Sequence, residues 1–88
     1  MKTIELKVSG RVQGVGFRFY TQKRALEFRV FGYVQNKPDG SVFIEAEGQA
    51  SDVDVFADWC ARGPAWSRVS QIVKSELPFV GYSKFEIK

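Results

Sequence analysis

The stretch TIELKVSGRVQGVGFRFYTQKRALEF, residues 3–28, changes its pattern of apolar residues partway along. Apolar and polar residues alternate over residues 3–8, which is the period of a half-buried strand. Three glycines within residues 9–16 predict a loop, and from Phe17 the apolar residues recur at helical spacing. The stretch therefore predicts a strand, a glycine-rich loop and a helix at about residues 17–27.

The next part of the chain predicts a β-hairpin. Val, Phe and Tyr are abundant in residues 30–35, and residues 41–47 alternate in polarity. Between these two segments, Asn36 is followed by Lys-Pro-Asp-Gly ending at Gly40, and this order is typical of a tight turn. Two β-rich segments around such a turn pair as antiparallel strands.

A second helix is predicted after the hairpin, with Ser51 as its N-cap and the Gly63-Pro64 pair as its stop signal. Strands at about residues 68–76 and 84–88 follow. The order is βαββαβ plus a short terminal strand, and right-handed crossovers place both helices on one face of a mostly antiparallel sheet. We therefore expect an α+β, ferredoxin-like sandwich, a fold that hosts many functions.

Length and composition narrow the possible functions. The 88 residues, taken as one domain over residues 1–88, include no histidine and a single cysteine, Cys60, which is expected in the core. An internal disulfide, a Cys/His zinc site and nucleophiles activated by imidazole are thereby excluded. The net charge of +3 mildly favours anionic ligands. With no apolar run near ~20 residues and no signal-like N-terminus, we expect a cytoplasmic protein without membrane contact.

The loop Gly10–Arg18 has the features of an anion-binding site. It leads into a helix N-terminus, where unpaired N–H groups carry partial positive charge. Gly14 and Gly16 let successive N–H groups point into one concavity, and the fork of Arg18 can donate two parallel hydrogen bonds to a phosphate. A glycine-rich connection with a surface arginine is the alternative explanation. The candidate backbone donors are those of Gln13, Gly14, Val15, Gly16 and Phe17.

These residues resemble the two signatures of the acylphosphatase family. Gly10–Arg18 matches the pattern Gly-x-Val-Gln-Gly-Val-x-Phe-Arg, and Gly32–Val42 matches Gly-x-Val-x-Asn-x-x-Asp-Gly-x-Val. The likeness covers essentially the whole chain. It departs between Leu26 and Gly32, where the family usually has a glycine between the first helix and the second strand, so the C-cap of the helix is less favourable.

The resemblance implies an enzyme that hydrolyses the carboxyl-phosphate bond of acyl phosphates, releasing a carboxylate and inorganic phosphate. It implies Arg18 as the phosphate-binding arginine and Asn36 as the residue that orients the attacking water. By its turn context alone, Asn36 is more often a conformational residue. A carboxylate leaves without prior protonation, which agrees with the missing histidine. We expect no metal and no cofactor, a small-molecule acyl phosphate as the only partner, and a monomer.

Two other functions compete with this interpretation. RNA-binding modules share the βαββαβ plan and stack bases on aromatic residues of the central strands. Residues 40–47 carry Glu45, Glu47 and one Phe in place of that motif, which argues against nucleic acid. A non-catalytic phosphate-binding regulatory domain, using the same loop as a sensor, stays open.

Overall fold

The helices and strands follow one another in the predicted order in a computed structural model that describes residues 1–88. The predicted helix over residues 17–27 is confirmed at both ends, and the strands agree with their predicted positions to within three residues. The elements are β1 (Lys2–Arg11), α1 (Phe17–Glu27), β2 (Phe31–Asn36), β3 (Val42–Gly48), α2 (Ala50–Arg62), β4 (Arg68–Leu77) and β5 (Phe85–Ile87).

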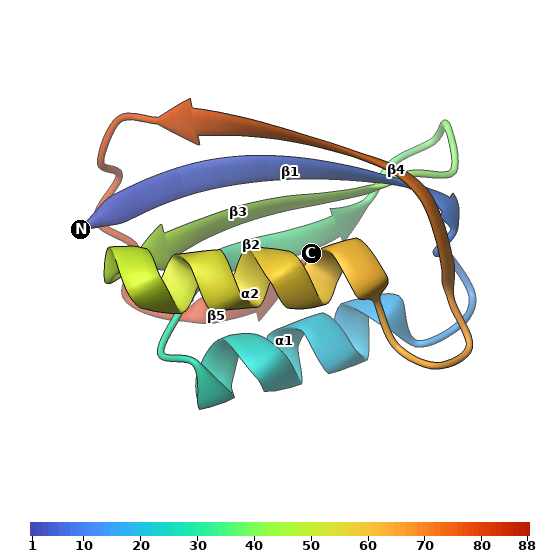
Figure 1. Cartoon of the computed structure of the whole chain (residues 1–88), viewed down its shortest axis with the longest axis horizontal. Helices are drawn as coiled ribbons and strands as arrows, with labels where there is room; N and C mark the ends of the chain where they lie inside the picture. The colour runs from blue at the N-terminus through green and yellow to red at the C-terminus, as the bar shows by residue number, and fades with distance from the viewer.

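The strands form one sheet in the order β4-β1-β3-β2-β5. The first four strands in this order pair antiparallel, whereas β5 pairs parallel with β2 at the sheet edge. Both helices cover the same face of the sheet (Figure 1). The predicted α+β, ferredoxin-like sandwich is therefore confirmed. Neither helix has the length and apolar composition that a bilayer-spanning helix needs.

The core lies between this sheet face and the two helices. Alternate strand residues point into it, as the period-two pattern predicts. Phe17, the first residue of α1, is buried there with its ring centroid 6.1 Å from that of Trp59, so packing fixes where the glycine-rich loop ends. Cys60 is also buried, as predicted, and burial raises the pKa of its thiol. Other members include Ile4, Leu6, Val8, Val34, Ile44 and Phe56.

The predicted N-cap of the second helix, Ser51, is wrong. Helix α2 begins at Ala50, with Gln49 as an N-cap that makes no side-chain hydrogen bond to the helix. The chain passes from β3 almost directly into the helix, and the Gln49 carbonyl already accepts from the N–H of Val53 at 2.9 Å. The short connection to the core strand, rather than a capping side chain, therefore sets the start of this helix.

The end of α1 carries a strained backbone at Arg29, where φ is 58°. Left-handed backbone of this kind costs a residue with a Cβ about 1–2 kcal/mol, whereas glycine adopts it freely. This is the stretch where the family usually has glycine, so the departure from the family pattern has a structural cost. It does not change where the helix ends.

We expect Arg29→Gly to stabilise the fold by about 0.5–1 kcal/mol, since the relieved strain exceeds the extra flexibility of glycine in the unfolded chain. Chemical denaturation measures the change in the free energy of unfolding. Arg29→Ala is the matched control, because it removes the same exposed side chain and keeps the Cβ. Equal stabilisation by alanine and glycine would show that the side chain, not the backbone, is responsible.

Glu47 is a buried carboxylate on the sheet face that the helices leave uncovered. The alternation of residues 41–47 puts its side chain on the polar side of β3, yet the residue is only 1% exposed. The segment between β4 and β5 folds over it and points three consecutive N–H groups at its oxygens. The donors are the N–H groups of Val80, Gly81 and Tyr82, at 2.7, 2.8 and 2.9 Å, and the hydroxyl of Thr3.

This arrangement predicts a pH-dependent contribution to stability. Burial tends to raise the pKa of Glu47, but the four hydrogen bonds together hold the pKa below its ordinary value of 4.5. The charged carboxylate therefore stabilises the fold above that pH, and the stabilisation is lost as the pH falls through the lower folded-state pKa.

We expect Glu47→Gln to lower the free energy of unfolding by about 2–3 kcal/mol at pH 7, because an amide NH₂ must face backbone donors. The difference in the free energy of unfolding between wild type and variant should narrow as the pH falls below 4.5, because the unfolded chain then takes up a proton that the folded carboxylate accepts only at lower pH. Thermal unfolding of the two proteins at pH 7 and at acidic pH measures this difference. The control is Glu76→Gln on β4, which is exposed. A deficit that is the same at both pH values would refute the role of the charge.

Candidate active site

The glycine-rich loop meets α1 with left-handed backbone at two positions. Gly14 has φ of 74° and Gly16, the N-cap of α1, has φ of 78°. Only glycine adopts these angles without a steric cost, which explains both residues. The N–H groups of Gly14, Val15 and Gly16 donate to no acceptor within the chain. They lie just before the N-terminus of a helix, where a bound anion is favoured.

Beside this loop is a cleft of about 210 Å³. Arg18, from the first turn of α1, and Asn36, from the last position of β2, both line it. The structure thus brings together the two side chains that the sequence selected. No carboxylate lines the cleft, and nowhere in the chain do three His, Cys, Asp or Glu side chains gather as metal ligands would. The lining residues are Val12, Gly14, Gly16, Phe17, Arg18, Phe19, Asn36 and Ile87.

The guanidinium of Arg18 is held at one corner only. Its Nη1 donates to the backbone oxygen of Lys88 at 3.3 Å, just beyond β5. A guanidinium has five N–H donors, so most of them stay free for a ligand in the cleft. The end of β5 therefore helps to orient the arginine without satisfying it.

Asn36 carries a polar atom that the fold leaves unsatisfied. Its side chain lies on the helix-covered face, since Asn36 is opposite Val42 and two residues beyond the buried Val34. Its Oδ1 is buried and has no hydrogen-bond partner. An unpaired buried acceptor costs about 1–3 kcal/mol, so folding alone does not explain it. A carbonyl oxygen in this position can accept a hydrogen bond from a water molecule in the cleft.

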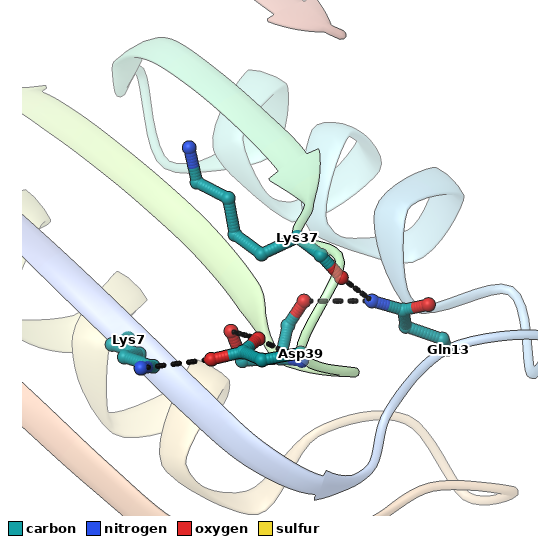
Figure 2. Close-up of polar contacts among 5 residues, drawn as sticks. Lys7, Gln13, Lys37 and Asp39 are labelled. Carbon is teal, nitrogen blue, oxygen red and sulfur yellow. Dashed lines mark hydrogen bonds and ion pairs between the residues drawn. The ribbon is translucent and has the colours of Figure 1, made fainter.

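Gln13 joins the loop to the turn that follows Asn36. Its Nε2 donates to the carbonyl oxygens of Lys37 and Ser41, each at 2.8 Å (Figure 2). The turn is held from within by Asp39, whose carboxylate accepts from the N–H and hydroxyl of Ser41 and pairs with Lys7 at 3.0 Å. Asp39 is thus a turn residue, as predicted. The side chain of Gln13 is a positioning group that sequence reasoning missed.

The predicted backbone donors separate into two groups. Gly14, Gly16 and Phe17 line the cleft, whereas Gln13 and Val15 do not. The side chain of Val15 packs against the core, and that of Gln13 points to the hairpin turn that begins at Lys37. That the N–H groups of Gln13 and Val15 bind phosphate remains a prediction.

Fold and cleft together define a ferredoxin-like α+β protein with an arginine and an asparagine beside a glycine-rich loop. The family model for acylphosphatases matches residues 4–87. The chain belongs to the acylphosphatase family, a family of hydrolases, and the family and enzyme class predicted from the sequence are confirmed.

Relatives and solved structures agree with this assignment. An acylphosphatase of Synechococcus sp. is 47% identical over 92% of this chain and 81% of the relative. One of Oceanobacillus iheyensis is 43% identical over 100% of this chain and 99% of the relative. The crystal structure of acylphosphatase from Bacillus subtilis, 36% identical, superposes with a TM-score of 0.96 and covers 100% of this chain and 99% of its own. These matches do not favour the RNA-binding alternative.

Proposed function

We propose that this chain hydrolyses acyl phosphates with Arg18 and the loop N–H groups as the phosphoryl site and Asn36 as the water site. The observation that carries the proposal is the cleft itself. A mostly unsatisfied guanidinium and a buried, unpartnered amide oxygen line it together with the glycines of the loop. One side of the cleft suits an anion and the other suits a neutral hydrogen-bond donor such as water.

The phosphoryl group would be held by charge and by oriented donors. The fork of Arg18 would donate to two phosphoryl oxygens, and the free N–H groups of Gly14 and Gly16, which line the cleft, would donate to the third. Donors that the loop and the helix hold before the substrate arrives would stabilise charge on the phosphoryl oxygens without rearranging.

The water would be held by the Asn36 amide on the side away from the leaving carboxylate. The oxygen of this water attacks phosphorus, and the bond from phosphorus to the carboxyl oxygen breaks. The electron pair of that bond leaves with the carboxylate. Both water protons end on the phosphate, so a doubly charged acyl phosphate and water give a carboxylate and dihydrogen phosphate. An amide does not remove protons, and this balance requires no protein base. We further propose that the reaction needs no metal, and that the protein is a cytoplasmic monomer.

Benzoyl phosphate tests the proposal directly, because its ultraviolet absorbance falls on hydrolysis. We expect the wild-type chain to clear that absorbance with chelator present and to be competitively inhibited by inorganic phosphate. The non-catalytic sensor would bind phosphate and leave the absorbance unchanged. Unchanged absorbance, together with phosphate binding measured by calorimetry, would show that the chain is a phosphate sensor and not an enzyme.

A further inference from the structure

Two large apolar side chains are exposed at the cleft. Phe19 is 59% exposed and Ile87 is 41% exposed, and both line the same cleft as Arg18 and Asn36. Single exposed apolar residues are common on protein surfaces and need no explanation. Here two of them border one polar cleft, so they form an apolar rim around a site that is otherwise suited to an anion.

The two side chains come from different elements and flank the polar pair. Phe19 directly follows Arg18 in α1. Ile87 on β5 is in register with Val34 on β2, two residues before Asn36 and on the same face of the sheet. One apolar group therefore comes from the helix that carries Arg18, and the other from the edge strand that pairs with the strand of Asn36.

An aromatic surface continues outward from the rim. The ring of Phe19 meets that of Tyr20 edge-on, with centroids 5.2 Å apart and planes at 80°. This contact orients the Phe19 ring although more than half of the side chain is exposed. Aromatic rings prefer such edge or offset contacts with a further ring, so the rim is suited to a planar aromatic group.

We propose that Phe19 and Ile87 form an acyl-group subsite that selects aromatic acyl phosphates over acetyl phosphate. The inference rests on the proposed function. If the phosphoryl group lies against Arg18 and the loop, the rest of the substrate leaves the cleft past its rim. An aromatic ring is large enough to cover the exposed surfaces of Phe19 and Ile87, whereas the methyl group of acetyl phosphate covers little apolar area. The two residues determine specificity and take no part in the bond-breaking step.

The test compares kcat/KM for benzoyl phosphate and acetyl phosphate in the wild type, Phe19→Ala and Ile87→Thr. We expect the benzoyl preference to fall about 5- to 10-fold in Phe19→Ala and about 3-fold in Ile87→Thr, through KM more than kcat. The matched control is Leu26→Ala, which removes a side chain that is 66% exposed on the same helix and does not line the cleft. An unchanged preference in both rim variants would overturn the subsite.

A binding measurement separates failure of the subsite from failure of the enzyme assignment. Benzoylphosphonate and acetylphosphonate have a non-hydrolysable carbon–phosphorus bond, so their affinities do not depend on turnover. We expect the wild type to bind benzoylphosphonate more tightly and Phe19→Ala to lose most of that difference. Equal wild-type affinities for the two phosphonates overturn the subsite. A preference for benzoylphosphonate without hydrolysis of either acyl phosphate overturns the proposed function alone.

Discussion

Arg18→Gln is expected to lower kcat/KM for benzoyl phosphate by about 10³-fold or more and to abolish competition by inorganic phosphate. Glutamine is polar but shorter, and it supplies neither the positive charge nor the planar fork that gives two parallel hydrogen bonds. Binding and turnover should fail together because the same contacts hold the phosphoryl group before and during the reaction.

Two further variants identify the cause of this loss. Arg18→Lys keeps the charge and loses the fork, so we expect weak phosphate inhibition with turnover still strongly reduced. Lys23→Gln removes an exposed positive charge from the same helix and should keep wild-type kinetics. Steady-state hydrolysis with phosphate as competitor measures all three. Wild-type phosphate inhibition in Arg18→Gln would remove this residue from the site.

Asn36→Ala should lower kcat by about 10²-fold while the inhibition constant of phosphate stays near the wild-type value. The amide orients water and not the phosphoryl group, so ground-state binding should survive its removal. Because Oδ1 has no hydrogen-bond partner in the chain, the substitution breaks no protein contact of that atom. We therefore expect no loss of thermal stability, which separates this loss of activity from unfolding.

The matched control for this variant is Gln35→Ala. Gln35 is the neighbouring amide of β2 and lies on the opposite face of the sheet, opposite Phe43. Its removal should leave kcat unchanged. A near-normal kcat in Asn36→Ala, or equal losses in the two variants, would show that the asparagine is not part of the mechanism.

Local periodicity predicted most of the fold. The shift from a period of two to helical spacing at Phe17 located β1, the loop and α1, because burial on one face imposes these periods. The burial of Glu47 could not be predicted in this way. It depends on N–H groups from Val80, Gly81 and Tyr82, more than thirty residues along the chain. The start of α2 was missed because no capping side chain sets it.

The candidate site shows the same division. Arg18 was selected as a candidate because it follows a glycine-rich loop at a helix start, and Asn36 because the resemblance to the acylphosphatase family implies it. Ile87 was not, since its place in the cleft follows from the parallel pairing of β5 with β2, which no local pattern encodes. The side chain of Gln13 was missed because its acceptors, Lys37 and Ser41, lie across a hairpin.

The single amide of Gln13 that spans loop and hairpin fixes the length of the segment between Lys37 and Ser41. Surface turns ordinarily accept insertions, and residues 38–40 are exposed to solvent. One inserted residue, however, would shift one acceptor relative to the other by about 3.3 Å, more than a hydrogen bond tolerates. This hairpin tip is therefore constrained in length, and Asp39, which holds the turn from within, constrains its sequence as well.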